Sequence, residues 1–200
     1  MNGEKEKKEQ LRNRIKELLN ECPSYLLEEK SRRIESRLYS LCEYKNSSFI
    51  MFYVSMEREV STLNAIKTTL AEKKKVAVPL ILKSQDIMLP CKINDFSDLK
   101  PGPFGILQPS KEKIHNIPLS LIDLIIVPGI AFDRNGNRVG KGKGFYDKFL
   151  KPMPATIPKI ALAFSCQIVE QVPINGDDVP VDKIVTEDEV IECKTRHKGT

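Results

Sequence analysis

The chain has 200 residues, of which 40% are hydrophobic, so it is long enough to form one domain with a sizeable core. Its formal net charge is +5, from 32 Lys and Arg against 27 Asp and Glu. This mildly basic balance suits an anionic ligand, but the absence of Trp and of a long basic run interleaved with aromatics does not favour nucleic-acid binding.

The first half of the chain predicts helices that alternate with buried strands. Apolar residues at spacings of three and four indicate amphipathic helices, and Ser24 is a candidate N-cap directly after Pro23. Dense apolar runs indicate buried strands. The expected elements are helices at residues 5–20, 24–44 and 62–73, and strands at 48–54, 76–82 and 87–93, the last two as a hairpin.

The second half begins with a Pro- and Gly-containing stretch at 96–118 that predicts a loop. Further elements follow it: strands at 121–127, 160–164 and 184–185, and a helix at 144–150. Strands alternating with helices predict an α/β fold, a single three-layer domain over residues 1–200 with a mainly parallel central sheet flanked by helices. We expect the ends, 1–5 and 194–200, to be flexible.

Cysteines, histidines and the N-terminus indicate the compartment. The five cysteines are dispersed without a CxxC pair, which is typical of reduced thiols in a cytosolic protein. Only two histidines occur, His115 and His197, far apart in the sequence, so neither a zinc site nor a Ser-His-Asp triad is expected. The N-terminus is charged and no apolar segment follows it, so we expect a cytoplasmic protein without a membrane partner.

The candidate chemistry follows Val127, because ligands of α/β folds bind beyond the carboxyl ends of strands. Residues 140–144 alternate Gly with Lys directly before a predicted helix. Such a loop lets backbone N–H groups and a helix N-terminus approach an anion, and Arg138 adds a further positive charge. Asp147 can bind a hard cation. This combination suits phosphoryl transfer with a metal ion.

The same pattern also fits a solvated, Gly-rich surface turn, and the spacing alone weighs both interpretations equally. It is neither a P-loop, since GxxxxGK[ST] is missing, nor a dinucleotide-binding fingerprint.

Longer segments resemble one known family. Residues 123–133 (DLIIVPGIAFD) and 137–147 (NRVGKGKGFYD) closely resemble the signature of the 5-formyltetrahydrofolate cyclo-ligase family, also called 5,10-methenyltetrahydrofolate synthetases. Other segments with the same resemblance are 8–12 (KEQLR), 55–60 (SMEREV), 105–109 (GILQP) and 178–187 (DVPVDKIVTE). In order and spacing they cover almost the whole chain.

The resemblance implies an enzyme that uses ATP and Mg²⁺ to convert 5-formyltetrahydrofolate into 5,10-methenyltetrahydrofolate, with release of ADP and phosphate. The implied nucleotide contacts are Lys8, Arg12, Arg138, Gly140, Lys141, Gly142, Lys143, Gly144, Phe145 and Tyr146. The implied folate contacts are Val54, Glu59, Phe104 and residues 141–145. Among these, Lys143, Arg138 and Tyr146 take the catalytic roles, and Asp147 and Asp178 are the metal ligands.

Each of these residues also has an ordinary structural interpretation. Lys8 and Arg12 can form the solvated face of a helix, Asp147 a first-turn helix charge and Asp178 a turn residue. For the whole chain, the alternatives are a catalytically silent relative that binds folate or nucleotide, a sugar-phosphate enzyme of similar architecture, and a basic nucleic-acid-binding protein. We expect a monomer that binds a small-molecule substrate and no nucleic acid.

Overall fold

The computed structural model describes residues 2–82, 87–102, 105–110 and 114–194. Its α-helices are α1 (Asn2–Glu21), α2 (Ser24–Ser40), α3 (Cys42–Asn46), α4 (Leu63–Ala71) and α5 (Phe145–Leu150). Its strands are β1 (Phe49–Met51), β2 (Lys75–Leu82), β3 (Ile87–Ile93), β4 (Leu99–Pro101), β5 (Leu107–Pro109), β6 (Leu124–Val127), β7 (Ala131–Asp133), β8 (Arg138–Val139), β9 (Lys159–Leu162), β10 (Ile168–Val169), β11 (Lys183–Val185) and β12 (Val190–Glu192). Short 3-10 helices cover Phe96–Asp98, Leu119–Leu121 and Ser165–Gln167.

The largest sheet has seven strands in the order β12-β11-β9-β6-β1-β2-β3. Neighbours from β11 to β2 pair in parallel, and only the two edge strands, β12 and β3, pair antiparallel. Every residue of β6 and β9 is buried, as expected for parallel strands that are covered on both faces. The sheet is therefore mainly parallel, as predicted, and the predicted hairpin of β2 and β3 is confirmed.

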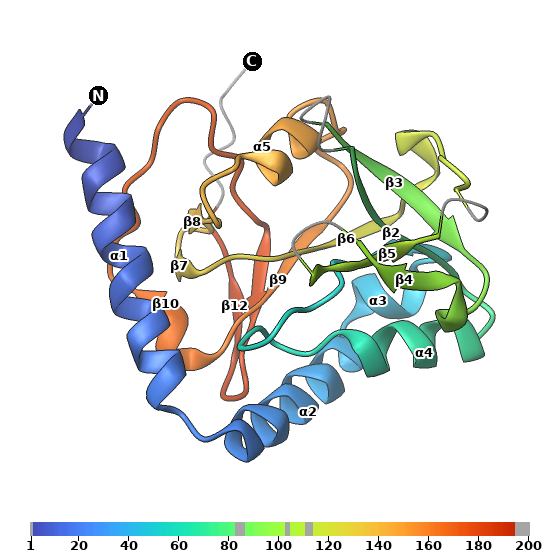
Figure 1. Cartoon of the computed structure of the whole chain (residues 1–200), viewed down its shortest axis with the longest axis horizontal. Coiled ribbons are helices and arrows are strands. Elements are labelled where there is room, and N and C mark those ends of the chain that lie inside the picture. Colours follow the sequence, from blue (N-terminus) through green and yellow to red (C-terminus); the bar gives the residue numbers. More distant parts are fainter. Residues whose placement is uncertain (1, 83–86, 103–104, 111–113, 195–200) are drawn as a thin grey trace.

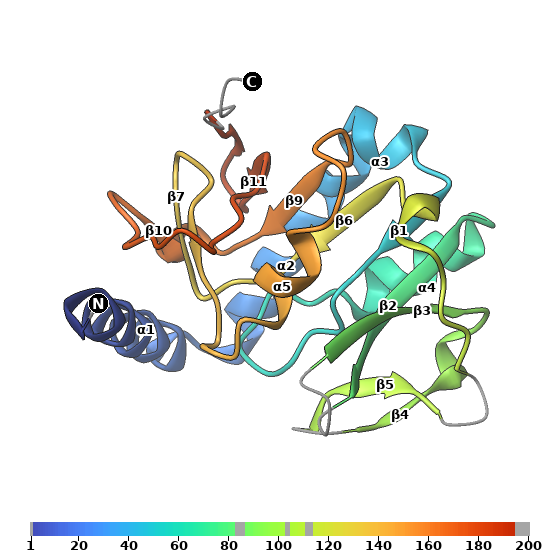
Figure 2. The ribbon, with the colours of Figure 1, turned by 90° about the horizontal axis from the view of Figure 1, so that it is seen from above.

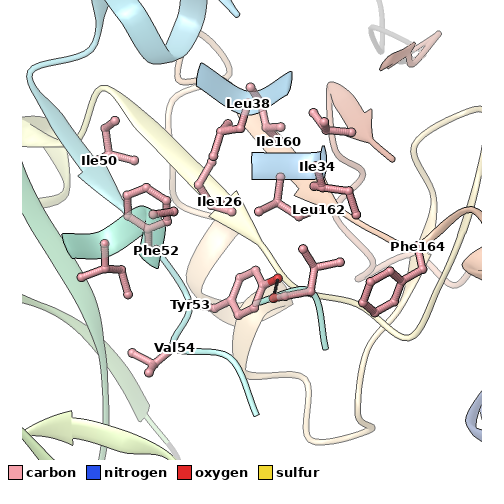
Figure 3. Packing of buried hydrophobic residues seen from close by; sticks show 14 of the residues in the cluster. Ile34, Leu38, Ile50, Phe52, Tyr53, Val54, Ile126, Ile160, Leu162 and Phe164 are labelled. Atoms are coloured by element: carbon pink, nitrogen blue, oxygen red, sulfur yellow. Dashed lines mark hydrogen bonds between the residues drawn. The ribbon is translucent and has the colours of Figure 1, made fainter. Parts of the chain in front are cut away.

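Helices cover both faces of this sheet and make the predicted three layers (Figure 1). Helices α2, α3 and α4 lie on one face, while α5 lies on the other, as the view from above also shows (Figure 2). On the first face Ile34 and Leu38 of α2 pack with Ile126 and Ile160 of the sheet (Figure 3). On the second face Phe149 belongs to a separate buried cluster. The predicted α/β class is confirmed.

Helix α1 lies beside the main sheet rather than on it, next to β7, β10 and the 3-10 helix Ser165–Gln167 (Figure 1). Its apolar stripe is buried, with Ile15 1% and Leu19 6% exposed. Lys8 is on the inner side of the helix as well, only 9% exposed. The helix begins at Asn2, and this amphipathic element matches the prediction closely.

Several local predictions were wrong. Pro23, not Ser24, is the N-cap of α2, and no side chain caps that helix end. The predicted helix 24–44 is divided at Leu41, whose extended backbone separates α2 from α3. The predicted loop at 96–118 contains β4 and β5, which pair antiparallel. A small sheet in the order β10-β7-β8 was not predicted either.

Candidate active site

The hairpin of β7 and β8 carries the chain from the end of β6 to the Gly-Lys loop. Asp133 is fully buried at the hairpin end. Its carboxylate accepts hydrogen bonds from the backbone N–H groups of Asn135 (3.0 Å), Asn137 (3.1 Å) and Val172 (3.0 Å). These bonds fix the hairpin turn directly before Arg138. Sequence reasoning missed this role of Asp133, although the residue lies within the signature segment.

The Gly-Lys loop, residues 140–144, uses backbone conformations that favour glycine. Gly142 and Gly144 have φ values of +98° and +68°, which side chains with a Cβ adopt at a cost. Gly144 is the N-cap of α5. The loop lies against α1, because the Arg12 Nε donates to Gly140 O at 2.8 Å. A Cβ on Gly142 would be 3.6 Å from the Arg12 guanidinium.

Lys8 and Arg12 lie on one face of α1, as their spacing of four predicts. Lys8 Nζ donates to Asp178 Oδ2 at 2.5 Å, and both side chains are largely buried, with exposures of 11% and 15%. Arg12 pairs with Glu9 at 2.6 Å as well as bonding Gly140. The interpretation of both residues as a solvated helix face is therefore wrong, because each contacts a distant part of the chain.

Arg138 and Asp147 form a second buried ion pair. Arg138 is 3% exposed, and its Nη2 donates to Asp147 Oδ1 at 2.7 Å. Burial lowers the pKa of Arg138, and the negative charge of Asp147 opposes that shift. The Arg138 Nε is buried without a hydrogen-bond partner among the described residues. An ionised donor in that position can bind an anion.

The two predicted metal ligands belong to this same charged region. Asp147 Oδ1 also accepts the backbone N–H of Val179, the residue after Asp178, at 3.2 Å. Within the described ranges, no donor bonds Asp147 Oδ2 or Asp178 Oδ1. No described group of three or more His, Cys, Asp and Glu residues could hold a metal by itself. Two carboxylates with free oxygens fit Mg²⁺ when phosphate and water supply its other ligands.

Glu59 faces the Gly-Lys loop from the opposite side. Its Oε1 lies 2.7 Å from Lys141 Nζ, and its Oε2 accepts the backbone N–H of Met56 at 2.8 Å. Lys141 Nζ is also 3.0 Å from the Met56 Sδ. Lys143, by contrast, is exposed and has no ion-pair partner in the described part of the chain. The loop thus offers one paired and one unpaired lysine.

A cavity of about 330 Å³ opens beside the loop. The apolar part of its lining, called the apolar wall below, includes Val54, Pro79, Ile81, Met88 and Ile106. The polar or charged part includes Glu59, Arg138, Lys141, Lys143, Tyr146 and Asp147. Val54, an implied folate contact, therefore lines this cavity, while Phe104 lies outside the described residues.

Two aromatic residues at the start of α5 directly follow the Gly-Lys loop. Phe145 and Tyr146 both line the cavity. The Tyr146 hydroxyl is buried and bonds no described residue. Burial and the nearby Glu59 charge raise its pKa, and Arg138 opposes this. Tyr146 therefore carries a neutral, buried hydroxyl whose hydrogen-bonding capacity no described residue satisfies.

The cavity lining includes residues that sequence reasoning missed. Ile81 lies near the carboxyl end of β2, so the rule on strand ends could have identified it. Met88 and Ile106 come from an antiparallel edge strand and from the stretch that was predicted as a loop, and no sequence signal assigns them to the site. Lys8, Arg12 and Asp178 are not among the described lining residues; Arg12 contacts the loop at Gly140, and Lys8 bonds Asp178.

Fold and site together define an α/β protein whose Gly-Lys loop lines a partly apolar cavity and contacts helix α1. The sequence profile of the 5-formyltetrahydrofolate cyclo-ligase family matches residues 4–187. The chain therefore belongs to that family, which is a family of ligases in folate one-carbon metabolism and thus of enzymes. The resemblance seen in the sequence is confirmed.

Individual relatives agree over most of the chain. It is 34% identical to the 5-formyltetrahydrofolate cyclo-ligase of Mus musculus, over 73% of this chain and 76% of the mouse protein. It is 28% identical to that of Haemophilus influenzae, over 90% of this chain and 97% of the relative. The NMR structure of Aquifex aeolicus 5,10-methenyltetrahydrofolate synthetase has a TM-score of 0.82 at 28% identity, and covers 96% of both chains. No described helix is long and apolar enough to cross a membrane.

Proposed function

We propose that this chain catalyses the ATP- and Mg²⁺-dependent cyclisation of 5-formyltetrahydrofolate to 5,10-methenyltetrahydrofolate, with release of ADP and phosphate. The observation that carries the proposal is that the Gly-Lys loop lines the same cavity as Glu59 and the apolar wall. A flat pterin suits the apolar wall, and the phosphates of a nucleotide suit the loop.

The folate end of the cavity provides an apolar surface and a carboxylate that can recognise the pterin. Val54, Ile81 and Met88 offer apolar contacts to the ring system. Glu59 can accept two parallel hydrogen bonds from the aminopyrimidine edge. Because Glu59 pairs with Lys141 in the free protein, we expect folate binding to shift Lys141 towards the phosphates, where its charge is needed.

The nucleotide end provides positive charge from two directions. The loop presents the backbone N–H groups of residues 140–144 and the side chain of Lys143, while α1 presents Lys8 and Arg12. Asp147 and Asp178 would hold Mg²⁺, which when bound supplies charge neutralisation at the phosphate oxygens. Lys8 would then exchange its bond with Asp178 for a phosphate oxygen.

The reaction needs the formyl oxygen in line with the γ-phosphorus. That oxygen attacks phosphorus and ADP leaves; N10 then attacks the formyl carbon and loses its proton, and the C–O bond breaks as phosphate departs. Lys143 and the unpartnered Arg138 Nε stabilise the charge on the transferred phosphoryl group. The buried Tyr146 hydroxyl donates to an oxygen at the reacting centre. The apolar wall holds N10 close to the formyl carbon and excludes water.

Ultraviolet monitoring of purified protein with 5-formyltetrahydrofolate and Mg-ATP tests this function. We expect the absorbance of the methenyl product to appear only when both substrates and Mg²⁺ are present. Binding of both ligands without product would identify a silent relative, and sugar-phosphate binding without ATP binding would identify a different enzyme. The cytoplasmic location, the monomeric state and the absence of a nucleic-acid partner remain predictions.

A further inference from the structure

The turn that carries Glu59 contains an unusual backbone conformation. The Glu59 N–H donates to Met56 O at 3.2 Å and closes a tight turn over residues 56–59. Arg58, the third residue of this turn, has φ +65°. Gly or Asn is the ordinary choice where a turn needs positive φ, because a longer side chain is strained there. Among the described non-Gly residues, only Arg58 and Lys73 have positive φ.

The side chain of Arg58 explains why a strained residue can stand in this turn. Its Nη1 donates to Leu19 O at 3.1 Å and to Cys22 O at 2.7 Å. These carbonyls lie at the C-terminal end of α1, where helix carbonyls lack partners within the helix. The last turn of α1 has no basic residue of its own. Arg58 therefore supplies both the hydrogen bonds and the positive charge that a helix C-terminus favours.

Arg58 thus connects two parts of the site that bind different ligands under the proposed function. Its own turn orients Glu59, whose Oε1 bonds Lys141, and the helix that it caps carries Lys8 and Arg12. Neither Arg58 nor its contacts line the cavity among the described residues. Any shift of the turn on folate binding is transmitted to the end of α1.

We propose that Arg58 is a positioning residue that couples folate binding at Glu59 to nucleotide binding at α1. This inference rests on the proposed function, since it assumes that both ligands bind this chain. The variants should fold, because α1 remains attached through Ile15 and Leu19, which are 1% and 6% exposed. Loss of the Arg58 side chain changes where the end of α1 lies, but the helix still forms.

The test compares Arg58→Gly and Arg58→Lys with a matched control, Lys73→Gly. Lys73 has φ +61° and follows α4, and it is exposed. Both Gly variants relax a left-handed residue, but only Arg58→Gly removes a contact with α1. For each protein we would measure KM for Mg-ATP, KM for 5-formyltetrahydrofolate and kcat. Calorimetry would give the affinity for a non-hydrolysable ATP analogue with and without 5-formyltetrahydrofolate.

In the wild-type protein we expect each ligand to increase the affinity for the other by about fivefold or more. Arg58→Gly should lower that factor towards one and raise KM for Mg-ATP about tenfold, the usual effect of losing a charge-assisted contact. Arg58→Lys should recover part of the coupling, because its ammonium can still reach the helix end. Lys73→Gly should leave both KM values and the coupling unchanged.

The inference is overturned if Arg58→Gly keeps wild-type coupling and KM for Mg-ATP, or if Lys73→Gly loses them equally. Both results leave the proposed function standing, because wild-type turnover is unaffected. A wild-type protein that binds neither ligand in the calorimeter overturns the proposed function, and this inference with it. A wild-type protein that binds both without turnover overturns the proposed function alone, and the coupling factors of the variants then decide this inference.

Discussion

At the scale of single residues, the site places its charges in pairs before any ligand arrives. Lys8 faces Asp178, Arg138 faces Asp147, and Lys141 faces Glu59. The pairing matters most for Arg138, whose side chain is 2% exposed. A charge at such depth is tolerated when a counter-charge and hydrogen bonds compensate its lost hydration. Asp147 therefore supports folding in addition to its proposed role as a metal ligand.

We expect Asp147→Ala to abolish turnover and also to destabilise the protein by about 3 kcal/mol, because it leaves the buried Arg138 without its counter-ion. Urea unfolding and the cyclisation assay would measure the two effects. The Arg138 contact at 2.7 Å is the reason to expect the loss of stability.

A double variant separates the two roles of Asp147. Asp147→Ala combined with Arg138→Met removes both charges, so most of the lost stability should return while the activity stays absent. If the double variant is as unstable as Asp147→Ala alone, the unpaired charge is not the cause of the destabilisation.

At the scale of elements, the hairpin of β7 and β8 fixes where the Gly-Lys loop begins. Gly136, in its turn, has φ +86° and donates to Asp133 O at 3.0 Å. Its own carbonyl accepts the Val181 N–H at 2.9 Å, which joins the hairpin to the segment that follows Asp178. The turn therefore joins the hairpin that precedes Asp147 to the segment that follows Asp178, the two proposed metal ligands.

We expect Gly136→Ala to destabilise the protein by about 3 kcal/mol or more, because an added Cβ would lie 2.2 Å from the Val181 carbonyl oxygen. Gly176→Ala is the matched control, since nothing lies within 4 Å of its Cβ position, and it should change stability by less than about 0.5 kcal/mol. Thermal and urea unfolding would measure both. Equal stability of the two variants would contradict the close approach at Gly136.

A buried carboxylate connects α2 to the segment after β11. Glu187 Oε1 lies 2.8 Å from Lys30 Nζ, and the Ser165 N–H donates to Oε2 at 2.8 Å. Burial by itself raises the pKa of Glu187, but the Lys30 ammonium and the Ser165 donors outweigh it, and the pKa is lowered overall. The pKa of Lys30 is raised by the same pair.

This shift gives a direction to the acid dependence of stability. A carboxyl whose folded pKa is lowered contributes stability above its unfolded pKa of 4.5, and that contribution is lost as the pH falls through the folded pKa. Glu187→Gln should therefore lower the urea midpoint at pH 7. It should also make that midpoint decrease less steeply as the pH is lowered. Glu57→Gln is the control, because its side chain is 89% exposed. A variant with an unchanged acid slope would show that Glu187 is not the titrating group.

The sequence predicted those elements whose signal extends over many residues. Dense apolar runs identified the strands of the main sheet except the edge strand β12, which was not predicted, and the spacing of Ile15 and Leu19 identified α1. Strands as short as β8 and β10 have no period to detect, so the small sheet was missed. In the site, the family signature located the Gly-Lys loop. The contacts of Arg58 with α1 and of Lys8 with Asp178 join residues far apart in the sequence, and no local pattern could indicate them.

At the scale of the whole molecule, the charged groups of the site come from separate parts of the chain. Helix α1, the turn at 56–59, residues 138–147 and the segment around Asp178 all contribute them. Because the cations and carboxylates already neutralise one another, the free protein offers a metal ion little net negative charge. Phosphates would change this balance by drawing the cations away from the carboxylates.

We therefore expect Mg²⁺ alone to leave the melting temperature unchanged, while Mg²⁺ with ATP raises it. At a ligand concentration of about 100 times Kd the added stability is about 2.7 kcal/mol, and for a domain of this size that is a shift of about 5–10 °C. Thermal unfolding with Mg²⁺ alone, ATP with a chelator, and both together would measure this. An equally large shift with Mg²⁺ alone would mean that the metal site is complete without phosphate, and that Lys8 and Arg138 do not compete for its carboxylates.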